Sequence, residues 1–222
     1  MKKTIKLITA MMYLFVTISS AQSVQDVNGK VYKAKSLSEV SGNTLLFQEF
    51  LKGDVTFKNG KDIKGLQLNF DALDNILLFK NSSAVIQEVS EPIKSFIVYE
   101  IKNGKYSSKS FESGFGKVLN FDEKTFYEVL YNGKYKFLKK INKYIIETSG
   151  YNAGTKSEEI REKSFYFIEI EGKLTQVSKN QKSIIGLFPE KESLIKDFIK
   201  KNKLNLSNEE DIVVLLSKIE SL

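Results

Sequence analysis

The 222-residue sequence contains no cysteine, no histidine and no tryptophan, and it has only two prolines. Without cysteine there are no disulfides, so a chain of this length must rely on a buried hydrophobic core. The missing histidine and cysteine exclude a Ser-His-Asp triad, a thiol nucleophile and an ordinary zinc site. Only carboxylate pairs, Ser-Lys dyads and tyrosines remain for catalysis. We therefore predict a non-catalytic protein with no catalytic residues, no metal and no cofactor.

Arginine is nearly absent as well, because Arg161 is the only one among the 34 basic residues. Proteins that read phosphates or base edges rely on the bidentate fork of arginine. The full chain has a net charge of +7, but three lysines lie in the first 21 residues. If that segment is removed, 31 basic residues face 27 acidic ones, which is an ordinary balance for solubility. These features argue against nucleic-acid binding.

Residues 1–21 have the three parts of a secretory signal peptide. A basic start precedes an apolar stretch over Leu7–Ile18, which is too short to span a membrane comfortably. The small residues Ser-Ser-Ala then offer a cleavage site that would leave Gln22 at the new N-terminus. The alternative is an uncleaved anchor helix. We predict export to the periplasm or the exterior, with no transmembrane segment after cleavage.

Residues 44–186 have the pattern of an antiparallel β domain. Short apolar and aromatic runs are separated by Gly, Asn, Asp and Ser, and several runs alternate with period two, as in Leu66, Leu68 and Phe70. Residues 22–43 are interpreted as an extended lead-in with one possible strand near Val31. The predicted fold class is α+β, a sandwich or open barrel of mostly antiparallel strands followed by two C-terminal amphipathic helices.

Asn-Gly-Lys occurs four times, at residues 28–30, 59–61, 103–105 and 132–134, with a Glu-Gly-Lys variant at 171–173. One interpretation is a repeated cationic binding element. Asn-Gly between two β runs is, however, the strongest short-range hairpin signal, because both turn residues must accept positive φ. The glycines are spaced too irregularly for a stacked repeat. We predict two-residue hairpin turns at the last four of these five places.

Residues 187–222 change to helical periodicity and are predicted to form a helical pair packed on the sheet. Pro189 marks a helix start, and Ser207 with Glu210 resembles a capping box for a second helix. Use of these helices against a partner helix or a membrane surface is the alternative. The polar stretch from Ser149 to Lys163 is interpreted as a mobile loop. The apolar positions of the two helices are Leu194, Ile195, Phe198 and Ile199, then Ile212, Leu215, Leu216 and Ile219.

Two acidic motifs and one glycine motif are candidate sites. The stretches "NFDALDN" (69–75) and "NFDEK" (120–124) place oxygen ligands close together, as Ca²⁺ sites do. Neither has the spacing of a known calcium loop, so Asx turns at strand ends are favoured. "ESGFGKV" (112–118) has a lone Gly-x-Gly and no following helix, so a bend is favoured over a phosphate site.

Tyrosine is the most suggestive residue type. On the wet face of a sheet it stacks on sugar rings or receives a peptide, whereas cross-strand pairing in the core explains the same enrichment. A sheet curled around an apolar cavity and closed by the helices would give a similar pattern and would carry a lipid. The candidate ligand contacts are Tyr127, Tyr131, Tyr135 and Tyr151.

Four segments carry a resemblance to known proteins. "FLKGDVTFKNGKDIKGLQLNFDALDNILLF", "PIKSFIVYE", "FYEVLYNGKYKFLKK" and "IKDFIKKNKLNLSNEEDIVVLLSKIESL" resemble uncharacterised exported proteins of flavobacteria and their relatives. The resemblance implies export into an envelope of that type and assigns no activity, ligand or site residue. We therefore expect a binding or interaction module for an envelope lipid, peptide, glycan or partner protein. The alternative is a carboxylate-based hydrolase, similar to a glycosidase, that acts without His or Cys.

Overall fold

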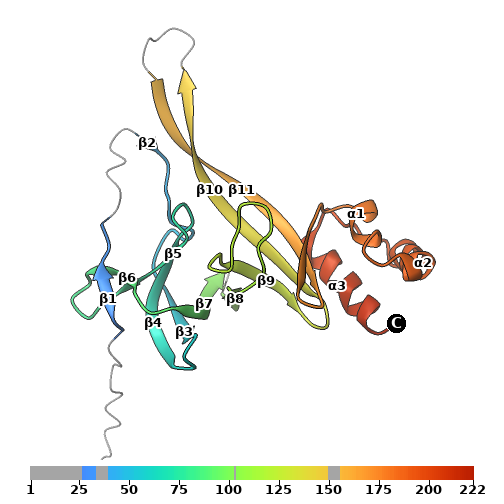
Figure 1. Ribbon diagram of the computed structural model, residues 1–222, viewed down its shortest axis with the longest axis horizontal. Coiled ribbons are helices and arrows are strands. Elements are labelled where there is room, and N and C mark those ends of the chain that lie inside the picture. Colours follow the sequence, from blue (N-terminus) through green and yellow to red (C-terminus); the bar gives the residue numbers. More distant parts are fainter. Residues whose placement is uncertain (1–26, 34–39, 103, 150–155) are drawn as a thin grey trace, which may run out of the picture.

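The computed structural model describes residues 27–33, 40–102, 104–149 and 156–222 (Figure 1). The predicted signal segment 1–21 and the candidate contact Tyr151 lie outside the described residues. Within the described ranges, no helix is both long enough and apolar enough to cross a membrane.

One 12-stranded sheet forms the body of the protein, with strands in the order β1-β6-β5-β4-β3-β7-β8-β9-β10-β11-β12. All strand pairs are antiparallel except the short β2, which runs parallel to β11. Among the described residues β1 and β12 do not pair with each other, so the sheet is open. The predicted α+β class with a mostly antiparallel sheet is confirmed. The strands are β1 (Gly29–Val31), β2 (Val40–Ser41), β3 (Leu51–Phe57), β4 (Asp62–Asp71), β5 (Ile76–Lys80), β6 (Ile86–Val89), β7 (Ile93–Lys102), β8 (Lys105–Glu112), β9 (Tyr127–Asn132), β10 (Lys136–Ser149), β11 (Lys156–Ile170) and β12 (Lys173–Val177).

Hairpins are present at all four predicted places, joining β3 to β4, β7 to β8, β9 to β10 and β11 to β12. The predicted two-residue turn is wrong at Asn59-Gly60, where only Gly60 has a positive φ (87°) and the N–H of Phe57 donates to the carbonyl oxygen of Lys61 at 2.9 Å. Asn103 of the predicted turn between β7 and β8 lies outside the described residues. The turn at Glu171-Gly172 has two residues, as predicted, and both have positive φ, 52° and 81°. The prediction is wrong at Asn132-Gly133, where neither residue has a φ in the left-handed region. There Asn132 still pairs with Lys136, and the backbone N–H of Lys134 donates to Glu220 Oε1 at 2.9 Å. A carboxylate from the last helix therefore holds this turn.

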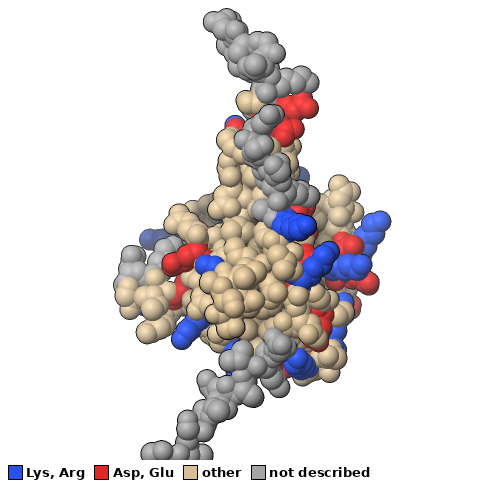
Figure 2. Space-filling view, turned by 90° about the vertical axis from the view of Figure 1, so that its left-hand side faces the viewer, with Lys and Arg blue, Asp and Glu red and all other residues tan. Residues whose placement is uncertain are grey.

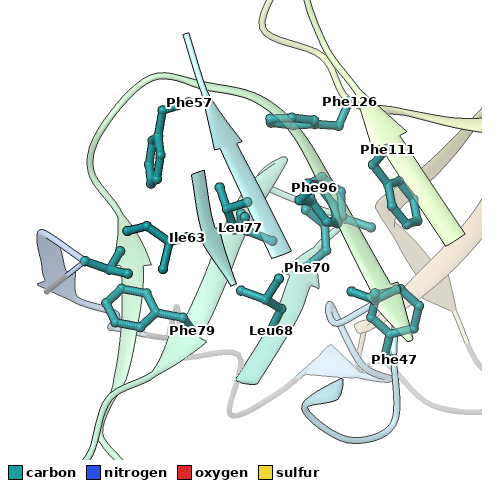
Figure 3. Close-up of a cluster of buried hydrophobic side chains, with 14 residues drawn as sticks. Phe47, Phe57, Ile63, Leu68, Phe70, Leu77, Phe79, Phe96, Phe111 and Phe126 are labelled. Carbon is teal, nitrogen blue, oxygen red and sulfur yellow. The ribbon is translucent and has the colours of Figure 1, made fainter. Parts of the chain in front are cut away.

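Three hydrophobic cores lie along the sheet. The first fills the curved half formed by β3 to β8, and Figure 3 shows its phenylalanines converging from several strands. The second lies between β9–β12 and the C-terminal helices, and the third lies under the 113–126 loop on the opposite face. Phe137 of β10 is buried in the second core and its neighbour Leu138 in the third. Both faces of the sheet are therefore covered at β10, as in sheets buried on both sides.

The helical region begins earlier than the predicted boundary at 187. It contains α1 (Gln181–Ile185), the 3₁₀ turn η1 (Pro189–Lys191), α2 (Glu192–Asn202) and α3 (Glu209–Glu220). The two amphipathic helices are confirmed as α2 and α3, and they pack on the sheet. The predicted capping box is wrong in its first member. The N-cap of α3 is Asn208, whose side chain accepts from the N–H of Glu210, whereas the Ser207 hydroxyl donates to Asn205.

Two further predictions about the sheet need correction. The stretch predicted as a mobile loop from Ser149 to Lys163 contains the end of β10 and much of β11, and only residues 150–155 lie outside the described residues. The run "GKVLNF" (116–121) is one of the short apolar runs from which the β domain was predicted, but it lies in the 113–126 loop, where Leu119 has a φ of 51°. The predicted strand near Val31 is present as β1.

The long β10–β11 hairpin crosses the middle of the molecule and is tied to its first half (Figure 1). Lys143 donates from Nζ to the carbonyl oxygens of Asn43 (2.8 Å) and Leu45 (2.6 Å), and β2 pairs with β11. Figure 2 shows the side formed by the first strands, where lysine and acidic side chains are interspersed around a largely uncharged surface. The ties hold the two halves of the sheet on either side of a hollow.

Candidate functional site

A cavity of about 1440 Å³ that is wide open to solvent lies between the two halves of the sheet. Its walls come from the β4–β5 turn, the β6–β7 turn, the 113–126 loop, and strands β10 and β11. The volume exceeds the range of roughly 300–1,000 Å³ that is usual for small-molecule sites. Apolar side chains make up much of the wall, among them Ile76, Leu77, Val89, Phe121, Phe126 and Phe165.

Six charged residues line this cavity, three of each sign, so it carries no net charge. All but one are partly or fully exposed, and Lys140 alone is buried, with 3% of its surface exposed. Glu88 forms an ion pair with Lys30 at 3.7 Å. The six are Lys58, Lys124, Lys140, Asp74, Glu88 and Asp122.

Lys140 faces the cavity because of its register in β10. Successive side chains of a strand point to opposite faces, so the adjacent lysines 139 and 140 must diverge. Lys139 lies on the helix face and forms an ion pair with Glu209 of α3 at 3.0 Å. Lys140 lies on the same side as Leu138, pairs in register with Phe165 of β11, and reaches the cavity.

The ammonium of Lys140 has few partners. It donates to Asn75 Oδ1 at 3.0 Å and lies 5.6 Å from the centroid of the Phe70 ring. Among the described residues no carboxylate forms an ion pair with it. Burial therefore acts unopposed and lowers the pKa of Lys140 to about 8. A buried, perturbed ionisable group in a large cavity is a strong candidate for a functional residue.

Asn75 fixes the position of the Lys140 ammonium. It has a φ of 59°, in the left-handed region that asparagine tolerates better than most residues. Its Nδ2 donates to the carbonyl oxygen of Lys124 at 3.0 Å, and its Oδ1 also accepts from the N–H of Phe126 at 3.2 Å. The β4–β5 turn, the 113–126 loop and β10 are thus joined through one amide side chain.

Replacing Asn75 with aspartate is expected to raise the pKa of Lys140 by more than about one unit, because a carboxylate would stand where the amide oxygen now accepts. The measurement is an NMR titration of the Lys140 side chain. Asn142→Asp is the matched control, since Asn142 lines the same cavity from β10 without bonding to Lys140. An unchanged pKa in Asn75→Asp would contradict the contact.

The tyrosines predicted as ligand contacts do not lie together on a solvent-exposed face of the sheet. Tyr127 is fully buried between Phe115, Phe121 and Phe167, and burial raises its pKa to about 12. Tyr135 is buried on the other face of the sheet, where the centroid of its ring lies 5.0 Å from that of Phe188. The prediction of a wet face is wrong for these two, because both faces of the sheet are covered here.

Tyr131 is half-buried, and its hydroxyl donates to Glu220 of α3. It therefore takes part in the contact that holds the β9–β10 turn to the last helix, and it does not line the cavity. Cross-strand and helix packing is the interpretation that fits all three described tyrosines.

The acidic motifs form turns, as the favoured interpretation expected. Asp71 Oδ1 accepts from the N–H groups of Leu73 and Asp74, and Asp122 Oδ1 accepts from the N–H of Lys124. In the part of the chain that the structure describes, no group of three acidic residues is arranged to hold a metal ion.

Lys140 was not among the predicted site residues, although a signal for it was present. Adjacent lysines in a strand point to opposite faces, so where both faces are covered neither side chain extends directly into solvent. Recognising this needed the knowledge that loop 113–126 covers the face opposite the helices.

Comparison with family models, curated proteins and solved structures finds no match to this chain. The interpretation of the site therefore rests on its geometry.

Proposed function

We propose that this protein is an exported, non-catalytic binding protein of the cell envelope that holds an amphiphilic small molecule in its cavity. The observation that carries the proposal is the cavity of about 1440 Å³, whose wall combines apolar side chains with one buried cation. Ligand sites typically combine apolar side chains, which supply contact area, with polar groups that fix the orientation of the ligand.

Among the ligands considered from the sequence, a lipid-like molecule fits best. Binding of a glycan or a peptide was inferred from exposed tyrosines, and two of those residues are buried in cores. The apolar wall instead suits a hydrocarbon chain, for which removal from water contributes roughly 0.8 kcal/mol per buried CH₂ group. Export is supported by the signal-like segment at residues 1–21.

The cavity-binding proposal is tested by blocking the cavity. Asn142 lines it from β10, and strands accept tryptophan readily. We expect the wild type to bind the uncharged fluorophore Nile red, Asn142→Trp to weaken that binding at least about tenfold, and the small control Asn142→Thr to bind like wild type. Tenfold corresponds to about 1.4 kcal/mol. Absence of binding to the wild type, or equal binding to Asn142→Trp, would refute the proposal.

A carboxylate hydrolase is the second candidate, because Asp74, Glu88 and Asp122 line the same cavity. Two of these acids would have to act from the two sides of a glycosidic bond. Turnover of nitrophenyl glycosides by the wild type, abolished in Asp122→Asn, would favour this candidate. Nile red binding without turnover would favour the binding protein.

A further inference from the structure

We propose that Lys140 is the anion-binding group of the cavity and that the ligand is a single-headed amphiphile, a carboxylate on an apolar chain. This inference rests on the proposed function and adds to it the chemical class of the ligand and the residue that recognises its head group.

The Lys140 ammonium has hydrogen-bond donors that the described residues do not satisfy. An ammonium has three donors and no acceptor. Asn75 Oδ1 is its one hydrogen-bond acceptor among the described residues. A buried cation with protons left over is unfavourable in an isolated protein and favourable once an anion occupies the adjacent space. A carboxylate in the cavity beside Lys140 would complete the missing bonds.

The charge of Lys140 lies beside the apolar wall of the cavity. Lys140 lies above Phe70 at the edge of the first core, and Phe126 of the cavity wall packs on the same ring, with centroids 5.8 Å apart. Phe165 is its register partner on β11 and also lines the cavity. The cation therefore lies next to aromatic and aliphatic surface, which places the head group of an amphiphile beside its chain.

The charges around the cavity indicate how many charges the ligand carries. Phosphate sites favour arginine forks, helix N-termini or several cations, and the only arginine, Arg161, is half-exposed on β11 and paired with Glu159 at 2.8 Å. The other cations of the cavity, Lys58 and Lys124, are exposed, and three acids line the same cavity. One buried ammonium in a cavity that also contains acids favours a monoanion over a phosphate or a nucleotide.

The test compares two probes that differ only in charge, dansylamino-undecanoic acid and its methyl ester, titrated by fluorescence at pH 7. We expect the wild type to bind the acid more tightly than the ester. Lys140→Met should weaken binding of the acid at least about tenfold and change that of the ester by less than about twofold. Lys64→Met removes a charge at an exposed position of β4 that does not line the cavity, and it should change neither affinity by more than about twofold.

Each outcome is decisive. Equal binding of acid and ester to the wild type, or unchanged acid binding by Lys140→Met, would overturn the assignment of Lys140 and leave cavity binding standing if Nile red binds. Binding of neither probe by the wild type would overturn the ligand class, and if Nile red also fails to bind, it would overturn the proposed function as well. The melting temperature of Lys140→Met distinguishes a lost contact from a lost fold.

Discussion

Replacing Lys140 with methionine is expected to stabilise the protein by about 2–4 kcal/mol at pH 7. Burial lowers the pKa of Lys140 from 10.5 to about 8. Each unit of pKa corresponds to about 1.4 kcal/mol, so holding the ammonium in the folded state costs about 3 kcal/mol. Methionine has a similar length and no charge, and Asn75 Oδ1 keeps its bond from the N–H of Phe126. The measurement is the free energy of unfolding in urea.

The pH dependence of the wild type supplies an independent check of this stability difference. The unfolded chain binds the proton of Lys140 more tightly than the folded chain does. The loss in the free energy of unfolding that comes from burying the ammonium is therefore complete below pH 8, and it decreases as the pH rises toward 10.5. The stability of the wild type relative to Lys140→Met should therefore rise between pH 8 and 10. Above pH 10 the opposite effect begins, because burial raises the pKa of Tyr32 and Tyr127 to about 12.

Lys139→Met is the matched control for this comparison. It removes the same charge from the adjacent position, but Lys139 faces the helices and is paired with Glu209. We expect this variant to be no more stable than wild type and to show the wild-type pH profile between pH 8 and 10. A Lys140→Met protein that is less stable than wild type would mean that contacts of the ammonium stabilise the fold.

Phe126→Ala is expected to destabilise the protein by about 3–5 kcal/mol, the usual range for a buried phenylalanine. Phe126 anchors the 113–126 loop on the first core, where its ring lies 5.3 Å from that of Phe96 in an edge-on arrangement. The substitution removes this packing and also opens the wall of the cavity. The free energy of unfolding measures the first effect, and Nile red affinity, which should fall several-fold, measures the second.

Phe115→Ala is the control for loop docking. Phe115 lies in the same loop but is only partly buried, against the third core. Phe115→Ala should lower the free energy of unfolding by less than half as much as Phe126→Ala, because folding buries less of the apolar surface of Phe115. A loss of under about 1 kcal/mol for Phe126→Ala would contradict the packing of the loop on the first core.

The hairpins and the two main helices were predictable because local chemistry determines them. Glu171-Gly172 forms a two-residue turn since both residues accept positive φ, and α2 and α3 follow from apolar residues at helical spacing. Asn132-Gly133 has the same local signal, yet its geometry is fixed by Glu220, nearly ninety residues away in α3. Such a contact leaves no mark on the sequence around the turn.

The missed features share a dependence on long-range contacts. The charged residues from Glu158 to Lys163 have weak strand preference, but they pair in register with β10 and so complete a long hairpin. Asn208, and not the predicted Ser207, is the N-cap of α3, because the Ser207 hydroxyl donates its hydrogen bond to Asn205. Lys140 was not among the predicted site residues because its burial depends on the 113–126 loop, whose residues 116–121 were counted among the apolar runs of the β domain.

We propose that the cavity holds an acidic amphiphile through Lys140. Native mass spectrometry of the wild-type protein and Lys140→Met, each isolated from the organism's own cells, tests this most directly. We predict a chain beginning at Gln22, with wild type carrying a bound carboxylate-bearing amphiphile that Lys140→Met has lost. A wild-type protein with an empty cavity, or the same bound molecule in both proteins, would contradict the claim.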